Sequence, residues 1–297
     1  MRKITFLGTS SMLPTKERNP SSILISLENE TIMIDCGEGT QRQLRIAGIS
    51  PCKITKLLIT HWHGDHILGL PGLIQSLGAN QYSGQLDIYG PKGTLEFFTN
   101  MRKSFYFPVR INLKLHEVSS GVFFRDKNME ISCIPLEHDV PCLGYSIKEQ
   151  DKRKINIEYT KKFGLVQHPL MGDLQKGKDI VYKGKKILAN KATKLKKGCK
   201  ITVVLDTAYN KKISEFSKDS SILICEATWA DELSGRSEDY KHLVASDAAR
   251  IAKEAKAQKL ILTHFSQRYK DVSKLKEQAR KIFRNTSCAQ DLEEVEF

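Results

Sequence analysis

A segment of six residues, His61-Trp62-His63-Gly64-Asp65-His66, brings three imidazoles and a carboxylate close together in the sequence. Neutral imidazole nitrogen and carboxylate oxygen are ligands that suit zinc and related divalent ions. Gly64 allows the backbone to turn tightly, so that residues on both sides of it can point inward. A lone histidine is often a solvated loop residue, but four ligand-type side chains in six positions predict a metal site.

The flanking residues predict how this segment is held. Residues 56–60, Lys-Leu-Leu-Ile-Thr, are typical of a short buried strand. Residues 68–72, Leu-Gly-Leu-Pro-Gly, lead into an apolar run to Leu77 that is typical of a helix. We therefore expect the segment on a loop between a strand and a helix, where functional residues are usually presented.

Three other ligand-type residues follow a predicted strand directly, as His61 does. They are His138, Asp206 and His264, after strands predicted at 129–136, 201–205 and 260–263. Taken singly, each is also compatible with an ordinary residue at the edge of the core. Ligands at strand ends are held on rigid elements and can converge at one edge of a sheet sandwich. With the first segment they make seven ligands, enough for two metals about 3.5–4 Å apart with one bridging carboxylate.

The other histidines do not share this pattern. His116 and His168 follow no strand end and are interpreted as structural or surface residues. His242 precedes a helix start predicted at Ser246-Asp247, too far from a strand end for a confident ligand. We interpret it as a group that supports the ligands or transfers a proton.

The predicted elements interleave strands and helices, which favours a layered α/β architecture. Strands at 22–27 and 31–35 are separated by a turn at 28–30 and are expected to be antiparallel. The other predicted strands are 4–7, 86–89, 111–118 and 222–225, and the predicted helices are 41–47, 94–103, 246–257 and 272–284.

Length and composition are those of a globular protein of one large domain or two ordinary ones. The chain has 297 residues, 40% of them apolar and 27% charged. No apolar run is long enough to span a membrane, and the first residues turn at Gly8 too early for a signal peptide, so a cytoplasmic protein is expected. The seven cysteines are scattered, without the spacing of a zinc knuckle or redox motif, and are expected to be reduced thiols.

The positive charge is concentrated in one segment. Residues 148–200 contain 16 lysines and arginines against five acidic residues, a surplus of 11 within a net charge of +13 for the chain. The segment is rich in lysine and glycine with poor periodicity, which predicts an inserted basic arm rather than core. Such a surface is suited to a polyanion such as nucleic acid, although a charge run is also compatible with a solvated face.

Several motifs resemble a known family. The segment 61–66 is similar to the His-x-His-x-Asp-His signature of the metallo-β-lactamase fold. The stretches at 6–10, 14–19, 35–44 and 264–269 resemble those of ribonuclease Z, the tRNA 3′-processing endonuclease, in its short form. The similarity extends over nearly the whole chain, and the Pro-x-Lys-x-Arg-Asn loop at 14–19 is far more specific than the metal signature.

The resemblance implies a single domain over 1–297, with a four-layer αββα sandwich, two zinc ions per subunit and a basic exosite arm at 148–200. It implies a homodimer that removes the 3′ trailer from precursor tRNA, leaving a 3′-hydroxyl on the tRNA and a 5′-phosphate on the trailer. The implied ligands are His61, His63 and His138 for one zinc, Asp65, His66 and His264 for the other, and Asp206 between them. Asp65 would also accept a proton from the attacking water.

The resemblance also assigns roles outside the metal ligands. Glu226 and His242 match a pair that delivers a proton to the leaving oxygen. The implied substrate-binding residues are Ser266 and Arg268, which hold the phosphate, and Lys16, Arg18 and Asn19 of the 14–19 loop. The chain departs from the family pattern at Cys225, which replaces a histidine before Glu226, at Leu243-Val244 after His242, and at His168-Pro169 in the arm.

Two alternatives stand beside this interpretation. A hydrolase of small esters, lactones or thioesters would use the same metal site but leaves the basic arm and the 14–19 loop unexplained. A nucleic-acid-binding protein with purely structural metals would have cysteine-rich, closed sites, whereas the predicted ligands here are histidines and aspartates.

Overall fold

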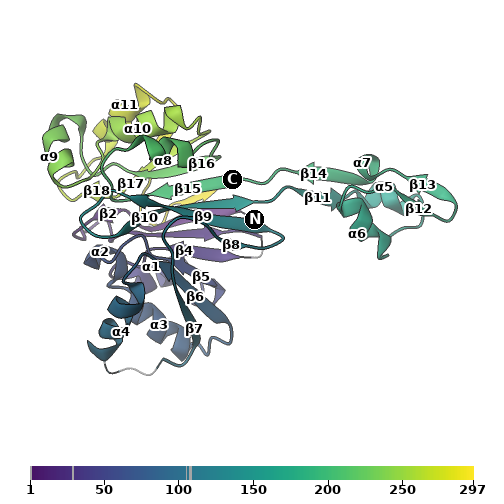
Figure 1. The fold of residues 1–297 in the computed structure, drawn as a ribbon, viewed down its shortest axis with the longest axis horizontal. Helices are drawn as coiled ribbons and strands as arrows, with labels where there is room; N and C mark the ends of the chain where they lie inside the picture. The colour runs from purple at the N-terminus through teal and green to yellow at the C-terminus, as the bar shows by residue number, and fades with distance from the viewer. Residues whose placement is uncertain (1, 29, 105, 107–108) are drawn as a thin grey trace. The chain divides into compact units, whose positions relative to one another are not determined.

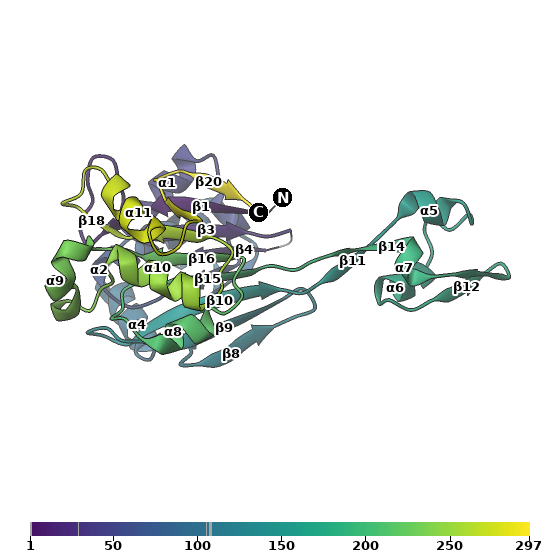
Figure 2. The same cartoon turned by 90° about the horizontal axis from the view of Figure 1, so that it is seen from above.

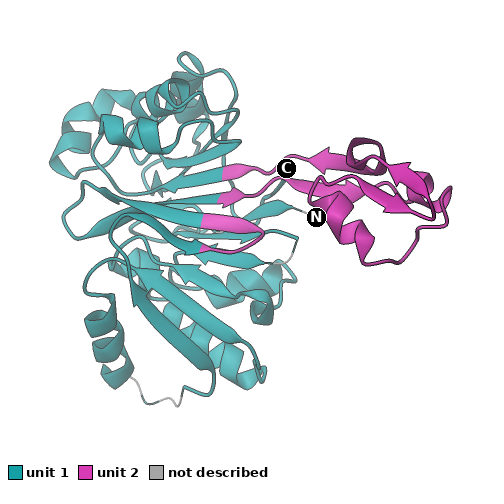
Figure 3. Cartoon of the chain, turned by 45° about the vertical axis from the view of Figure 1, so that its right-hand side comes forward, with its two compact units in different colours: residues 1–124, 131–147, 201–297 teal, residues 125–130, 148–200 magenta. Residues whose placement is uncertain are grey.

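The computed structural model describes residues 2–28, 30–104, 106 and 109–297, so Asn29 of the predicted 28–30 turn lies outside the described residues. The chain divides into two compact units, coloured separately in Figure 3. Unit 1 consists of Met1–Phe124, Ile131–Ile147 and Ile201–Phe297, and unit 2 consists of Arg125–Glu130 and Lys148–Lys200. Within the described ranges, no helix combines the length and apolarity needed to cross a membrane.

Two seven-stranded sheets form the centre of the fold (Figure 1). The first has the order β20 (Glu294–Glu296), β1 (Lys3–Gly8), β3 (Ser22–Ser26), β4 (Thr31–Ile34), β5 (Lys56–Leu58), β6 (Gln85–Gly90) and β7 (Asn112–Glu117). The second has the order β19 (Thr286–Cys288), β17 (Leu260–Thr263), β16 (Ile222–Glu226), β15 (Lys200–Val204), β10 (Cys142–Glu149), β9 (Met129–Leu136) and β8 (Gly121–Arg125).

The strand directions explain why ligand-type residues converge. The predicted antiparallel pairing of β3 with β4 is confirmed, and β1 also pairs with β3 in antiparallel fashion. By contrast, β4, β5, β6 and β7 are parallel neighbours, and so are β15, β16, β17 and β19. Parallel strands end at the same edge of a sheet, so residues that follow them in the sequence lie close together.

Helices cover the outer face of each sheet. Figure 2 shows the helices of the second sheet lying across the strands of that sheet. The first sheet packs against α1 (Thr40–Ile46), α3 (Leu70–Ala79) and α4 (Thr94–Ser104), and the second against α8 (Lys211–Phe216), α10 (Ala245–Glu254) and α11 (Ser273–Arg280). Side chains alternate along each strand: Leu24 and Met33 face the first helix layer, and Leu223 and Leu262 face the second. The predicted αββα architecture is confirmed.

Hydrogen bonds join the two sheets beside the predicted metal segment. The hydroxyl of Tyr145, which is fully buried in β10, donates to the carbonyl of Ile59 at 2.6 Å. The amide of Leu143, also in β10, donates to the carbonyl of Thr60 at 2.9 Å. Because Ile59 and Thr60 directly follow β5, the second sheet fixes the chain where it enters the loop of His61.

The remaining elements of unit 1 are short. They are β2 (Ser10–Ser11), which pairs in parallel with β18 (Phe265–Ser266), the helices α2 (Gly64–Ile67) and α9 (Ser234–Asp239), and the 3₁₀ turns η1 (Pro51–Lys53) and η2 (Asp231–Leu233). Strands β8 and β10 were not predicted from the sequence. β10 is buried on both faces apart from Lys148, so it lacks the alternation that marks a half-buried strand.

Unit 2 has a small core of its own. It contains β11 (Lys152–Ile155) paired with β14 (Thr193–Lys196), β12 (Ile180–Tyr182) paired with β13 (Lys185–Ile187), and the helices α5 (Ile157–Lys161), α6 (Leu170–Gln175) and α7 (Ala189–Ala192). Leu165, Leu174, Ile180 and Ile187 are buried among them. These elements have three to six residues each, too few to produce the periodicity that was sought in the sequence.

Two local features agree with the sequence. Lys183 and Gly184 join β12 to β13 with positive φ angles of 49° and 73°, as a two-residue hairpin loop requires. The seven cysteines all lie in the described ranges and none of them is in a disulfide: Cys36, Cys133, Cys142, Cys199 and Cys225 are buried, and Cys52 and Cys288 are partly buried.

Candidate metal centre

Three histidines direct ring nitrogens toward one point. Nε2 of His61 lies 3.1 Å from Nδ1 of His63, and Nε2 of His138 lies 3.2 Å from the same atom. The first two residues follow β5 and the third follows β9, so the two sheets contribute to the group together. Nitrogens about 2.0–2.1 Å from a tetrahedral metal ion lie about 3.4 Å from each other, which these separations approach.

A second group lies on the other side of Asp206. Oδ2 of Asp65 is 3.3 Å from Nε2 of His66 and 3.6 Å from Nε2 of His264. His66 and His264 are fully buried, whereas Asp65 is partly buried at the start of α2. Residues from the loop after β5 and from the end of β17 thus form a second set of ligand atoms, all within 4.8 Å of one another.

The carboxylate of Asp206 lies between the two groups. Its Oδ1 is 3.5 Å from Nε2 of His66 and 3.3 Å from Nε2 of His264. Its Oδ2 is 3.8 Å from Nε2 of His61 and 4.0 Å from Nε2 of His138. Since each oxygen faces a different group, the carboxylate is placed as a bridging ligand would be.

Unsatisfied polar atoms show that these residues fit a metal cofactor. Nε2 of His66, Nε2 of His264 and Oδ1 of Asp206 are buried and have no hydrogen-bond partner in the described part of the chain. An unpaired buried polar atom is costly, so such atoms are normally paired or bound to a metal. These three atoms face one another across the centre, where a cation would satisfy all of them.

A second set of side chains orients the imidazoles from behind. Oγ1 of Thr60 lies 3.0 Å from Nδ1 of His61, and Oγ1 of Thr228 lies 3.0 Å from Nδ1 of His264. Oδ2 of Asp35 lies 2.6 Å from Nδ1 of His66. In each case the outer nitrogen is held by an oxygen, which leaves Nε2 directed at the centre, as in known metal sites.

Burial and neighbouring charges shift the pKa values of the ligands. Burial, followed by the positive charge of His66, lowers the pKa of His61 well below its ordinary value, so this imidazole is neutral and can offer a lone pair. Burial opposes ionisation of Asp206, but the charges of His264 and His66 outweigh it and hold the pKa of Asp206 well below its usual range. His66 differs: burial lowers its pKa, but the charges of Asp206 and Asp65 raise it well above the ordinary value, so a metal that binds His66 must displace its proton.

Three residues of the centre have strained backbone conformations. Asp35, Asp206 and His264 have positive φ angles of 55°, 32° and 58°, and each stands where the chain leaves a strand. This left-handed region is costly for residues other than glycine, although aspartate and histidine tolerate it better than most. The surrounding sandwich maintains the strain, and the result is that Asp206 and His264 point into the centre while Asp35 points at the outer nitrogen of His66.

His242 and Glu226 form a pair next to the centre. Nδ1 of His242 is 3.0 Å from Oε2 of Glu226 and 3.9 Å from Oδ2 of Asp206. Glu226 is fully buried at the end of β16, where Oε1 accepts from the amide of Thr207 at 2.8 Å and Oε2 accepts from the hydroxyl of Thr228 at 2.5 Å. These donors fix the carboxylate, which in turn orients the imidazole.

The pair keeps a proton available. Burial lowers the pKa of His242, but the charge of Glu226 and its hydrogen bond raise it to about 9. His242 is therefore protonated at neutral pH and lies in the cavity as a candidate proton donor.

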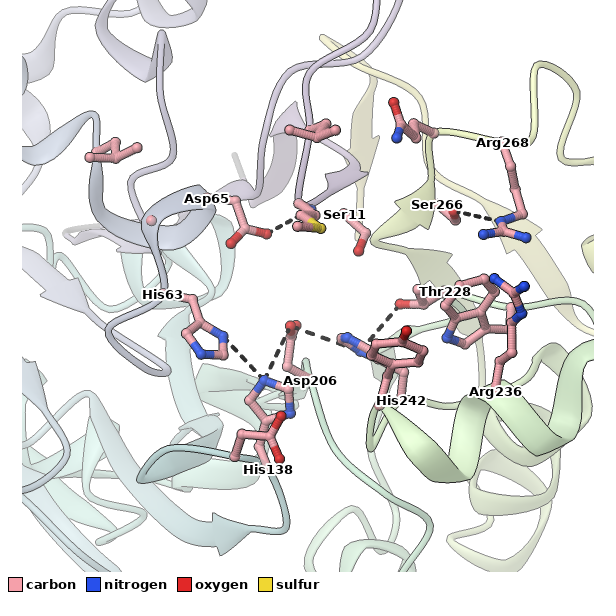
Figure 4. A pocket seen from close by; sticks show the side chains of 18 residues that line it. Ser11, His63, Asp65, His138, Asp206, Thr228, Arg236, His242, Ser266 and Arg268 are labelled. Carbon is pink, nitrogen blue, oxygen red and sulfur yellow. Dashed lines mark hydrogen bonds and ion pairs between the residues drawn. The ribbon is translucent and has the colours of Figure 1, made fainter.

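Four of the seven ligands, His63, Asp65, His138 and Asp206, line a cavity of about 710 Å³, shown in Figure 4, where Asp206 lies between His138 and His242. Ser266 and Arg268, both predicted to bind substrate, line it, and Nε of Arg268 donates to Oγ of Ser266 at 3.1 Å. The cavity volume is in the usual range for small-molecule and cofactor sites.

The three predicted substrate-binding residues of the 14–19 loop do not line this cavity. Arg18 donates to the carbonyl of Ser266 at 3.2 Å, and the amide of Asn19 donates to Oδ2 of Asp291 at 2.7 Å. The side-chain amide of Asn19 donates to the carbonyl of Glu38, and Lys16 is exposed. In this structure Arg18 and Asn19 therefore tie the loop to the sandwich.

The two histidines interpreted as structural lie outside the cavity lining. Nε2 of His116 lies 2.8 Å from Oδ1 of Asp87, and His168 packs edge-on against Tyr182 at 5.2 Å between ring centroids.

Sequence reasoning missed several residues of the site. Asp35 follows β4 as His61 follows β5, and this signal could have found it. Met12 donates its backbone amide to Oδ2 of Asp65 at 2.8 Å, and Trp229, Arg236 and Tyr240 line the cavity. No sequence signal distinguishes these four residues from ordinary loop residues.

The comparisons with known proteins agree with this geometry. The model of the metallo-beta-lactamase superfamily matches residues 15–140. A Ribonuclease Z of Methanothermobacter thermautotrophicus is 37% identical over 100% of this chain and 97% of its own, and one of Pyrococcus horikoshii is 39% identical over 99% and 96%. The crystal structure of human tRNase Z, short form, covers 99% of this chain and 98% of its own with a TM-score of 0.73 and 24% identity, which shows a shared fold.

Proposed function

The chain belongs to the ribonuclease Z family, and on that basis we propose that it is the endoribonuclease that removes the 3′ trailer from precursor tRNA. The observation that supports this reaction most directly is the position of His242, paired with Glu226, beside a carboxylate that faces two groups of metal ligands. A phosphodiester displacement needs charge stabilisation at phosphorus and a proton for the leaving oxygen, and a proton donor beside metal ligands would supply both.

We propose two zinc ions per subunit as the cofactor. His61, His63 and His138 would hold one, Asp65, His66 and His264 would hold the other, and Asp206 would bind both. Histidine nitrogen and carboxylate oxygen are suitable zinc ligands. When bound, the two ions supply stabilisation of the negative charge that develops on the phosphate during the reaction.

The side chains of the cavity carry the proton transfers. Asp65 accepts a proton from the attacking water, whose oxygen forms the new bond to phosphorus. As the bond between phosphorus and the 3′-oxygen of the tRNA breaks, His242 gives its proton to that oxygen, and Glu226 stabilises the imidazolium before the transfer. The products are a tRNA with a 3′-hydroxyl and a trailer with a 5′-phosphate.

Ser266 and Arg268 are proposed to bind the phosphate, since both line the cavity and a guanidinium suits phosphate oxygens. Lys16 of the 14–19 loop is proposed to contact the substrate backbone, with Arg18 and Asn19 holding the loop in place.

The proposed activity is tested by incubating the zinc-loaded protein with a 3′-extended precursor tRNA and mapping both product ends. We expect one cut at the junction of tRNA and trailer, a 3′-hydroxyl upstream and a 5′-phosphate downstream, and no cut after metal removal until zinc is restored. A folded, metal-loaded protein that leaves the precursor intact but hydrolyses small esters or lactones would contradict the proposal in favour of the small-ester hydrolase.

We propose that the inserted basic arm, residues 148–200 of unit 2, binds the body of the tRNA. Its segment 148–200 carries a surplus of 11 positive charges, and most of these lysines are exposed. Each lysine that neutralises a phosphate releases counterions, so this binding is expected to be strong at low salt and largely independent of sequence.

A charge-neutralised arm should bind precursor tRNA more weakly. Replacing four exposed arm lysines with glutamine (Lys176, Lys178, Lys183 and Lys185) is expected to lower affinity about 10- to 100-fold and to flatten its dependence on salt, because phosphate contacts are lost. The control replaces four exposed lysines of unit 1 (Lys211, Lys212, Lys253 and Lys281) with glutamine. Filter binding over a range of salt concentrations compares the two, and equal losses would show that only net charge matters.

The working enzyme is proposed to be a cytoplasmic homodimer, as the family resemblance implies. Light scattering of the purified protein measures its molar mass against the 33.7 kDa of one chain.

A further inference from the structure

One wall of the cavity contains two aromatic rings and two guanidinium groups that the proposed proton transfers do not use. Trp229 follows β16, Arg236 and Tyr240 lie in and directly after α9, and Arg268 follows β18. Arg236 and Tyr240 are four residues apart, so both can face the cavity from the same side of a helical turn. Residues from three separate segments thus meet on one wall.

One cation of this wall lies over a ring, and the two rings are neighbours. Cζ of Arg268 lies 4.3 Å from the ring centroid of Trp229, and the rings of Trp229 and Tyr240 are 6.2 Å apart with an angle of 34° between their planes. Trp229 is 8% exposed, whereas Tyr240 is 56% exposed. Trp229 is therefore fixed inside the wall, and Tyr240 offers an open ring face at the cavity.

The cations of the wall are available to a ligand. Neither Arg236 nor Arg268 has a carboxylate partner among the residues that the structure describes, whereas the neighbouring Lys241 is paired with Asp139 at 3.1 Å. An exposed aromatic face beside unpaired guanidinium groups is the combination that binds single-stranded nucleic acid, because bases stack on the ring and phosphates pair with the cations.

The wall is tied to His242. Tyr240 lies two residues before His242. The hydroxyl of Ser237 in α9 donates to the carbonyl of His242, and the amide of His242 donates to the carbonyl of Ser237 at 2.9 Å. Oγ1 of Thr228, the residue before Trp229, lies 3.5 Å from Nδ1 of His242. Because His242 serves the leaving oxygen in the proposed function, a nucleotide that carries this oxygen is the one that lies against this wall.

We propose that Tyr240, supported by Trp229 and flanked by Arg236 and Arg268, stacks on the base of the unpaired nucleotide whose 3′-oxygen is released. This inference rests on the proposed function and adds a positioning residue to it. Stacking accepts any base, since every base has a π-face, so the contact would hold the end of the tRNA in place without reading its sequence.

The test combines Tyr240→Ala and Tyr240→Phe with two precursor tRNAs, one intact and one with an abasic site at that last nucleotide. For the intact substrate, Tyr240→Ala is expected to lower kcat/KM about 5- to 150-fold, the range of one base-stacking contact, whereas Tyr240→Phe keeps the ring and the rate. The abasic substrate should be cleaved slowly by the wild type and no more slowly by Tyr240→Ala. Tyr106→Ala, which removes an exposed tyrosine outside the cavity lining, is the control and should not change kcat/KM.

Two outcomes separate the possible failures. If Tyr240→Ala slows cleavage of both substrates by the same factor, the ring does not contact that base and the stacking role is overturned while the proposed function remains. If the wild type cleaves neither substrate, the proposed function is overturned, and the subsite with it.

Discussion

Replacing Asp206 with alanine is expected to remove bound metal and abolish phosphodiester hydrolysis together. The two carboxylate oxygens of Asp206 face different histidine groups at 3.3–4.0 Å, so both metals would lose a ligand at once. They would also lose the negative charge that offsets two divalent ions in a buried site. Metal content after gel filtration, measured beside single-turnover cleavage of precursor tRNA, should fall well below two ions per subunit.

The matched control is Asp139→Ala. Asp139 lines the same cavity, but its side chain is 60% exposed and pairs with Lys241 rather than facing the imidazoles. This variant is expected to keep its metal. Full metal content in Asp206→Ala would contradict the bridging role, and loss of metal in both variants would indicate a general sensitivity of the cavity to charge.

The sequence predicts the centre well where a ligand directly follows a buried strand. Asp206 and His264 each come at the end of an apolar run, and His138 comes two residues after the alternating strand β9; each is therefore expected near the edge of a sheet. The structure brings all three to the centre with His61. Asp35 follows the same rule after β4 but was absorbed into the predicted strand, so the oxygen that orients His66 was missed.

The sequence predicts less where contacts between distant segments decide the structure. Arg236 and Tyr240 lie in a polar stretch, 231–241, whose few apolar residues show no helical period, so α9 and its place on the cavity wall could not be inferred. The same limit applies to Arg18, which looks like a substrate-binding residue in the sequence but donates to the carbonyl of Ser266, 248 positions later.

The sequence predicts the pairing of His242 with Glu226 only in part. Glu226 ends β16 in the manner of a ligand, yet its oxygens accept from the amide of Thr207 and the hydroxyl of Thr228 instead of facing the metal ligands. A carboxylate satisfied in this way orients an imidazole rather than binding a metal. Removing His242 and removing Asp206 are therefore expected to differ in their effect on metal content, although both should lower activity.

His242→Ala is expected to slow cleavage of precursor tRNA about 10²- to 10⁴-fold while metal content stays near that of the wild type. Nδ1 of His242 lies closer to Glu226, at 3.0 Å, than to Oδ2 of the ligand Asp206, at 3.9 Å, so removing the ring is expected to leave the metal ligands in place. Metal analysis and single-turnover rates on one preparation separate chemistry from cofactor loss. A large loss of metal in this variant would assign His242 to the ligands instead.

The choice of leaving group tests the proton transfer itself. A ribose 3′-oxygen leaves as a strong base and needs a proton, whereas p-nitrophenolate leaves readily without one. If His242 protonates the leaving oxygen, His242→Ala should lose much less activity on bis-p-nitrophenyl phosphate than on precursor tRNA, because only the second reaction depends on the donor. Equal losses on both substrates would mean that His242 positions the phosphate or the attacking water, and the proton for the 3′-oxygen would then have to come from another group in the cavity.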